Sequence, residues 1–245
     1  MSVEVRHIMG MPIEIDVRDE DVDVEPAFAW LRRADELFST YRADSEISRL
    51  GRGELLLSEC APEVDEVLTR CLALRRETGG YFDVRAGGTL DPSGLVKGWA
   101  VARAADVLAR AGARRLFINA GGDIVTRGGP WRIGIRHPVE RSRLAAVLEV
   151  SDLAVATSGE YERGRHVLDP HTGRPPEGLL SATIVGPDLA TADAYATAAF
   201  AMGAAGPEWT TTLDGYEALC ITTDHRVLST PGLDPLRVHT AWDNG

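Results

Sequence analysis

Two oxygen-bearing side chains stand four residues apart in an alanine-rich segment near position 195. The segment 191–197 reads TADAYAT, so Asp193 and Thr197 share one face of a helix. A carboxylate and a hydroxyl in this arrangement offer two hard oxygen ligands suited to Mg²⁺. A structural explanation also exists, because Thr191 is a good N-cap and an acidic residue in the first turn complements the helix dipole. Taken alone, the segment favours the structural explanation.

Lys97 is the one lysine among the 26 basic residues of the chain, the other 25 being arginines. A compact ammonium and a planar guanidinium are not equivalent at a tight site. Lys97 lies in the segment DPSGLVKGWA (91–100), which reads as a glycine-containing turn that leads into a helix after Gly98. Backbone amides at a helix start can hold an anion, and Lys97 can add a point charge. An exposed lysine in an ordinary turn explains the pattern equally well, and the order of a phosphate-binding P-loop is absent.

Three further segments carry polar groups beside glycine. Gly121 and Gly122 precede Asp123 after a short strand, where a tight hairpin is the simpler explanation. Thr157, Ser158 and Gly159 can bind phosphate or the edge of a flavin. His166 is suited to accept a proton from an attacking hydroxyl near neutral pH, although it could instead anchor the turn that follows it.

Composition limits the partners and the setting. The formal charge of −11 repels nucleic acid, so an anionic nucleotide would need local neutralisation, for which a divalent cation is the obvious candidate. Cys60, Cys71 and Cys220 form neither a metal-binding spacing nor a disulfide framework. The first residues alternate like a strand and resemble no signal peptide, and no apolar run approaches membrane-spanning length, so we expect a cytoplasmic protein without a membrane span.

The periodicity of the apolar residues indicates irregularly interleaved strands and helices. We expect a strand pair over 3–17, broken at Met9–Pro12, and further strands near 116–119, 131–135, 147–158, 181–185 and 217–228. Expected helices run from Pro26 to about Tyr41, through 45–50, from Pro62 to Gly79, from Gly98 to Gly112 and over 191–202. This order predicts an α+β fold with largely antiparallel pairing.

Together these segments resemble the FAD:protein FMN transferase family, the ApbE-like flavin transferases. The similar motifs run from Met9 to about Gly203 and are Met9-Gly10, FSTY (38–41) with SEIS (45–48), GYFD (80–83), Lys97-Gly98, GGD (121–123), TSG (157–159), HVLDP (166–170) and TAD (191–193). The resemblance implies a T-fold-like α+β architecture with a mostly antiparallel sheet and packed helices. It also implies one domain over 1–245, or two closely packed lobes.

The resemblance further implies Mg²⁺-dependent transfer of FMN from FAD to a threonine or serine hydroxyl of a target protein, with release of AMP. Asp193 and Thr197 would bind Mg²⁺ together with the carbonyls of Gly94 and Ala196. His166 and Asp193 would be catalytic. The residues that would line the FAD site are Met9, Tyr41, Tyr81, Phe82, Asp83, Asp91, Lys97 and Val167.

Two departures from the family pattern stand out. Met11 occupies a position where threonine is usual, and only Val84–Leu90 joins the Phe-Asp motif to Asp91, where relatives commonly carry a longer segment. The sequence leaves two other activities open. The same site with water as nucleophile would make an FAD pyrophosphatase, and without turnover it would be an FAD-binding protein.

Overall fold

The computed structural model describes residues 2–19, 21–140, 142–159 and 167–238. An eight-stranded sheet forms its centre, with strand order β1-β2-β3-β4-β7-β8-β9-β10 and every pair antiparallel. Its strands are β1 (Ser2–Ile8), β2 (Met11–Val17), β3 (Leu116–Ala120), β4 (Asp123–Arg127), β7 (Ala154–Gly159), β8 (Leu179–Gly186), β9 (Glu217–Thr222) and β10 (Val227–Ser229). A second sheet pairs β5 (Trp131–Arg136) with β6 (Leu144–Val150).

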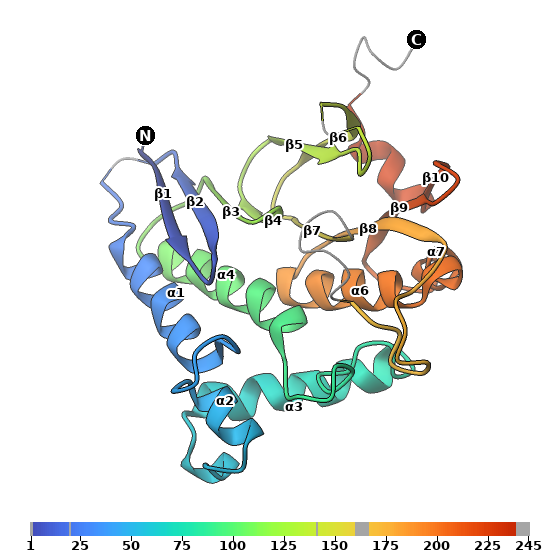
Figure 1. The fold of residues 1–245 in the computed structure, drawn as a ribbon. Coiled ribbons are helices and arrows are strands. Elements are labelled where there is room, and N and C mark those ends of the chain that lie inside the picture. Colours follow the sequence, from blue (N-terminus) through green and yellow to red (C-terminus); the bar gives the residue numbers. More distant parts are fainter. Residues whose placement is uncertain (1, 20, 141, 160–166, 239–245) are drawn as a thin grey trace.

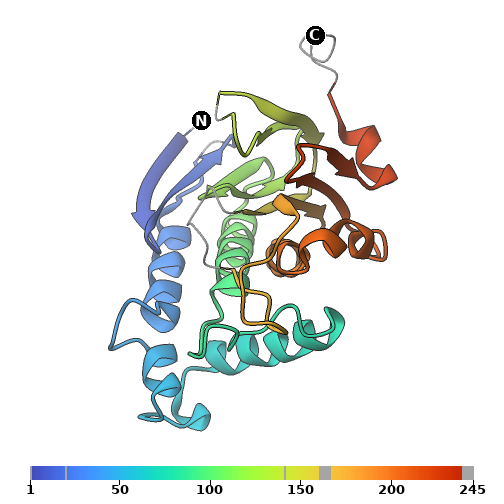
Figure 2. The ribbon, with the colours of Figure 1, turned by 45° about the vertical axis from the view of Figure 1, so that its right-hand side comes forward.

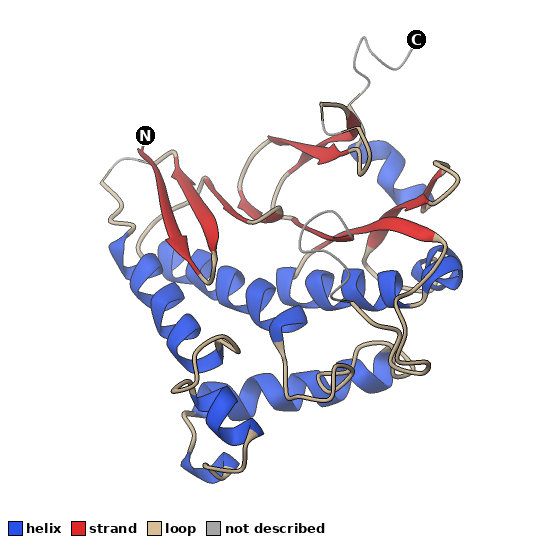
Figure 3. Cartoon of the chain, viewed as in Figure 1, coloured by secondary structure: helices blue, strands red, loops and turns tan. Residues whose placement is uncertain are grey.

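Helices cover one face of the large sheet, as Figures 1 and 3 show. The helices on this side are α1 (Glu25–Phe38), α2 (Glu46–Gly51), α3 (Pro62–Glu77), α4 (Ser93–Arg110), α6 (Leu189–Ala201) and α7 (Gly206–Thr210), with single turns of 3-10 helix at Leu57–Glu59 and Gly203–Ala205. A longer 3-10 helix, Pro231–Leu236, lies on the other side of the sheet, where Leu233 packs in one cluster with Trp131 of β5. Inward-facing strand residues such as Ile13, Ile15 and Ile118 pack against Leu31 and Leu108 in the main core. We call the face of the large sheet that the helices cover its inner face.

The small sheet lies on the opposite, outer face of the large sheet (Figure 2). Trp131, Ile133 and Ile135 of β5 alternate with exposed residues and pack with Ile124 and Val155 of the large sheet in a second core cluster. This alternation is what the sequence predicts for a half-buried strand. The helices therefore cover the inner face of the large sheet, and the small sheet covers part of the outer face.

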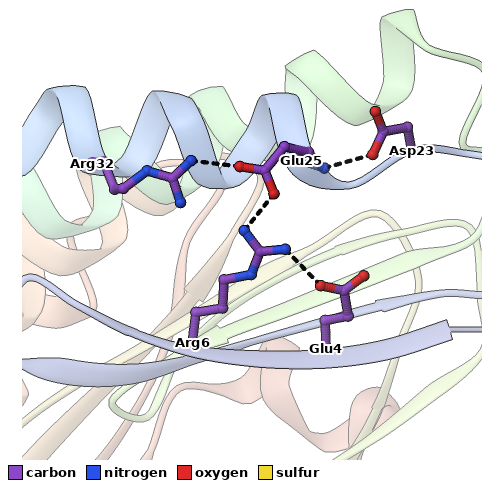
Figure 4. A network of polar contacts seen from close by, with 5 residues as sticks. All are labelled: Glu4, Arg6, Asp23, Glu25 and Arg32. Atoms are coloured by element: carbon purple, nitrogen blue, oxygen red, sulfur yellow. Dashed lines mark hydrogen bonds and ion pairs between the residues drawn. The ribbon is translucent and has the colours of Figure 1, made fainter.

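The hairpin of β1 and β2 turns through Met9 and Gly10, whose φ angles are 56° and 74°. Two successive residues at positive φ are typical of two-residue hairpin turns, whose backbone twist matches the right-handed twist of the flanking strands. An exposed ion network then joins this hairpin to α1 (Figure 4): Arg6 contacts Glu25 at 2.5 Å and Glu4 at 2.9 Å. Hydrogen bonds from Arg32 and Arg6 lower the pKa of the Glu25 carboxyl. Because the network is exposed, it fixes geometry more than it adds stability.

Several helix boundaries differ from those the periodicity predicts. Helix α1 ends at Phe38 and leaves Tyr41 in a turn, 95% exposed, because the hydroxyls of Ser45 and Ser48 both donate to the Ser39 carbonyl and turn the chain. Helix α6 begins after Asp188, whose carboxylate accepts the Thr191 amide at 2.8 Å. Thr191 is therefore inside the helix and is not its N-cap.

The expected start of the third long helix is also wrong. Helix α4 begins at Ser93, immediately after Pro92, and Asp91 accepts the Ser93 amide at 2.9 Å. Lys97 and Gly98 thus lie within the helix. Among the described helices, none is long and apolar enough to cross a membrane.

Candidate functional site

A pocket of about 260 Å³ opens where the first turns of α4 meet α6 and the end of β7. Ten of the residues to which the resemblance assigns a role line it: Tyr41, Tyr81, Phe82, Asp83, Asp91, Gly94, Lys97, Val167, Asp193 and Thr197. These residues come from widely separated parts of the chain, and the antiparallel sheet with its covering helices brings them together.

Asp193 is held at the floor of this pocket by close contact between α4 and α6. The Gly98 amide donates to Asp193 Oδ2 at 3.0 Å, and the residue is 2% exposed. A Cβ at Gly98 would lie 2.5 Å from the Leu189 carbonyl oxygen and 2.9 Å from Asp193 Cβ. Only glycine therefore allows the two helices to approach this closely. Gly98 acts through helix packing and does not form part of a helix-start anion site.

Lys97 lies between two carboxylates in the same pocket. Its Nζ is 2.7 Å from Asp123 Oδ2 and 3.7 Å from Asp193 Oδ1. The Asp123 side chain is 0% exposed and that of Lys97 is 15% exposed. Among the described residues, two carboxylates thus share one ammonium group. Desolvated groups of this kind are found where a charged ligand or cation is to be bound.

Thr197 and Gly94 meet on the next turn of the two helices. Thr197 Oγ1 lies 3.3 Å from Ser158 Oγ at the end of β7. A Cβ built at Gly94 would be 3.3 Å from Thr197 Oγ1 and 3.2 Å from Phe82 Cε2. The missing side chain of Gly94 therefore leaves its backbone close to the Thr197 hydroxyl.

The end of β7 is fixed from the sheet side. Asp123 Oδ1 accepts the Thr157 amide at 3.2 Å, and the Thr157 and Thr183 hydroxyls are 2.9 Å apart. Asp123 thus joins the turn before β4, strand β7 and Lys97 of α4 in one polar cluster.

Aromatic side chains form another wall of the pocket. The Tyr81 ring contacts His171 edge-on, with centroids 4.5 Å apart, and Phe82 is buried. Arg75 pairs with Asp83 at 3.0 Å. Tyr41 lines the mouth and is nearly fully exposed, so its ring is available to a ligand. Flat apolar surfaces beside a charged floor suit a molecule that has both rings and phosphates.

The donor atoms fit Mg²⁺ only if a ligand completes the shell. No described group of three or more His, Cys, Asp or Glu residues could hold a metal ion. Asp193, Thr197 and Gly94 line the same pocket, and Mg²⁺ is commonly bound by one or two carboxylates plus substrate phosphates. These residues would therefore fit Mg²⁺ together with a bound diphosphate.

The remaining predicted site residues lie elsewhere. Met9 is in the β1–β2 turn, packed against the main core, and Ala196 is fully buried in α6; neither is among the described residues that line the pocket. Their assigned roles stay predictions. His166 lies outside the described residues, so its role as a base also stays a prediction.

Thr157 and Ser158, which the sequence indicates as possible contacts for phosphate or flavin, do line the pocket, whereas Asp123 was given no role in the site. The sequence did contain a signal for Asp123. An aspartate directly after a glycine pair lies where a turn enters a strand, so its carboxylate stands beside exposed backbone. The simpler explanation of that segment as a hairpin is also correct, since Gly121 and Gly122 form the β3–β4 turn.

Comparison with known proteins places this arrangement in a family. The model of the ApbE family matches residues 9–89 and 85–220. The chain belongs to the ApbE family. The two matched segments overlap at 85–89, inside the segment that we expect to be shortened relative to other ApbE proteins.

Curated relatives carry the name FAD:protein FMN transferase. The Rhodobacter capsulatus protein is 30% identical over 216 residues, covering 83% of this chain and 39% of the relative. The Vibrio cholerae protein is 36% identical over 129 residues, covering 46% of this chain and 39% of the relative. This ApbE chain thus matches about two fifths of the length of each.

A solved structure described as the flavin transferase ApbE from Vibrio cholerae superposes on this chain with a TM-score of 0.84. It is 24% identical and the match covers 96% of this chain and 98% of that one. The α+β fold of ApbE type, with mostly antiparallel pairing, is therefore confirmed.

Proposed function

We propose that this ApbE protein transfers FMN from FAD to a threonine or serine hydroxyl of another protein and releases AMP. Two lines support the proposal: the names of the curated relatives, and a pocket that combines aromatic walls with a charged floor. The observation that carries it is the meeting of Lys97 and Asp193, 3.7 Å apart, beside the Thr197 hydroxyl. A cationic group and an oxygen-donor set at one point are what binding and activation of a diphosphate require.

The metal would be held by Asp193 and Thr197, with the Gly94 carbonyl beside them. The Ala196 carbonyl remains a further predicted ligand. When bound, Mg²⁺ would neutralise phosphate oxygens and stabilise the charge that develops as the bond to AMP breaks.

The other pocket residues bind and orient the substrate. Lys97 places a positive charge next to the diphosphate, while Asp123 fixes the position of its ammonium group. Tyr41, Tyr81 and Phe82 offer ring faces, and the side chains of Asp83 and Asp91 offer hydrogen-bond acceptors. Val167 adds apolar surface at the same wall.

The reaction forms one phosphoester bond and breaks one phosphoanhydride bond. The acceptor hydroxyl attacks the phosphorus on the FMN side, and the bond between that phosphorus and the AMP oxygen breaks. The hydroxyl proton passes to a base, for which His166 is the predicted residue. AMP leaves with the electron pair of the broken bond.

The test is to incubate the protein with FAD, Mg²⁺ and a candidate acceptor, then to weigh the acceptor and quantify nucleotides. We expect the acceptor to gain the mass of FMN less water, with one AMP released per modified acceptor. AMP and free FMN with an unmodified acceptor would indicate hydrolysis. FAD recovered unchanged, although bound, would indicate a binding protein. Either result contradicts transfer.

A further inference from the structure

A second cavity, of about 510 Å³, lies on the outer face of the large sheet. Its floor includes Glu14, Asn119, Val155 and Thr157, and its side wall is the segment Ile133–Arg136 of β5. Glu14 alternates with the inward-facing Ile13 and Ile15, which places Glu14 on the face away from the helices. We call this cavity the outer groove.

The wall of the outer groove that β5 supplies is a main-chain edge. Side chains of a strand alternate between its faces, so four consecutive residues, Ile133–Arg136, can all line one cavity only if the backbone edge faces it. Within the described part of the chain, β5 pairs with β6 alone. The backbone donors and acceptors on its other edge are therefore directed at the groove.

The floor of the groove is complementary to a strand laid along that edge. Val155 and Thr157 are two residues apart on β7 and face the same way, as do Pro12 and Glu14 on β2. A main-chain edge beside a row of side chains at two-residue spacing is the arrangement that binds an extended peptide by strand addition. Gly121 and Gly122 keep the end of the groove nearest Asp123 free of side chains.

Two residues of opposite charge, Glu14 and Arg136, are among those that line the groove. The structure shows no hydrogen bond or ion pair to either side chain from another described residue. By contrast, Arg132 on the same strand lies outside the groove and pairs with Glu149 at 3.2 Å. Charges of opposite sign in the groove favour a peptide whose side chains carry the complementary pattern.

The outer groove adjoins the candidate active site. Thr157 lines both cavities, and its amide is bound to Asp123, which pairs with Lys97. The next residue, Ser158, lies on the active-site side and contacts Thr197. A segment lying in the groove would therefore lie beside the residues that line the catalytic pocket.

We propose that the outer groove binds an extended segment of the acceptor protein as an added strand along β5, and directs its hydroxyl past Thr157 into the active site. The proposal rests on the proposed function and names how the protein substrate is recognised. The occupant is an extended, Thr- or Ser-containing peptide segment, because the wall offers main-chain hydrogen bonds and the cavity adjoins the place where a hydroxyl must attack.

The test uses bead-bound random peptides with a fixed central threonine, incubated with the full chain, FAD and Mg²⁺. Beads that acquire flavin fluorescence are sorted and their peptides sequenced. A selected peptide is then assayed with Arg136→Glu, Glu14→Arg and the matched control Arg132→Glu. FAD binding in the absence of peptide is measured for each variant, because the groove charges should not affect it.

We expect the two groove variants to modify the selected peptide about tenfold more slowly, mainly through KM, and the control to match the unsubstituted protein. Sorting with Arg136→Glu should also enrich basic residues where the unsubstituted protein enriches acidic ones. A merely structural effect of the substitution would not reverse this preference.

Other outcomes overturn the proposal in distinguishable ways. If the groove and control variants modify the peptide at equal rates, the groove does not bind the peptide, and the proposed transfer activity is unaffected. AMP and free FMN without any labelled peptide indicate hydrolysis and, like the absence of both AMP and label, contradict the proposed function itself. If the protein forms a dimer that Arg136→Glu abolishes, while peptide modification is unchanged, the β5 edge binds a second copy of this chain.

Discussion

The ammonium group of Lys97 lies 2.7 Å from Asp123 Oδ2, inside a polar cluster that the helices shield from solvent. Lys97 comes from α4 and Asp123 from the first position of β4, so the pair joins a helix to the sheet that it covers. Asp193 of α6 stands on the other side of the same ammonium group, at 3.7 Å. One cation thus orders carboxylates from a strand and from a second helix.

Loss of the ammonium group should destabilise the fold. Lys97→Met leaves the carboxylate of Asp123 buried next to that of Asp193, and breaking a buried pair costs about 3 kcal/mol. Lys97→Met combined with Asp123→Asn should recover much of the loss. Urea unfolding measures both. Arg143→Met, which removes an exposed pair with Glu140, is the control and should change stability by about 1 kcal/mol or less. If Lys97→Met alone is as stable as Arg143→Met, the prediction is contradicted.

Asp193→Asn should abolish metal-dependent turnover while preserving the fold. The amide keeps the shape of the side chain but removes the charge that a divalent cation requires. Release of AMP should fall by about 100-fold or more, as expected when stabilisation of the transferring phosphoryl group is lost. Asp106→Asn, an aspartate on α4 paired with Arg127, should retain full activity. AMP released by Asp193→Asn at the normal rate would refute the metal assignment.

Gly98→Ala should damage both stability and activity. The new Cβ would meet the Leu189 carbonyl oxygen and Asp193 Cβ, so α6 must shift and carry Asp193 with it. We expect a loss of about 1–3 kcal/mol in urea unfolding, as for other overpacked cores, and slower AMP release. Gly51→Ala places its Cβ at an ordinary 3.4 Å from Leu90 and should be nearly neutral. Equal stability of the two variants would show that the helices can separate here without cost.

Stability should depend on Asp19 in the acid range. The amides of Arg115 and Arg114 both donate to its carboxylate at 2.7 Å, and these bonds lower its pKa from 3.8. A lowered pKa stabilises the fold above the unfolded value, and this contribution disappears as the pH falls through the folded value. Asp19→Ala should therefore be less stable than the unsubstituted chain at neutral pH, with the difference narrowing below about pH 4. Thermal unfolding across the acid range measures this, and a constant difference would contradict it.

Local sequence signals predicted the elements of the fold well. The alternation around Trp131 predicted β5, and the proline at 62 predicted the start of α3. Boundaries were wrong where a side chain from outside the element decided them. The carboxylate of Asp188 caps α6 three residues before Thr191, the cap that the alanine-rich pattern indicates, and the carbonyl of Ser39 accepts hydrogen bonds from the hydroxyls of Ser45 and Ser48.

The candidate site was predicted only in part, because its geometry depends on packing between elements. The four-residue spacing of Asp193 and Thr197 correctly placed both on one helical face. No local pattern shows that Gly98 allows α6 to approach α4, or that Asp123 reaches Lys97 from the sheet. The outer groove also depends on where the small sheet lies on the large one, which sequence periodicity does not specify.

Calorimetric titration of FAD into the protein, with Mg²⁺ and with a chelator, tests the central claim most directly. In the proposed function, Asp193 and Thr197 would share the metal with the phosphates of FAD, so metal and FAD should bind together. We expect Mg²⁺ to tighten FAD binding by about tenfold or more, and Asp193→Asn to remove this coupling. Equal affinity of the unsubstituted chain for FAD with and without Mg²⁺ would contradict the account.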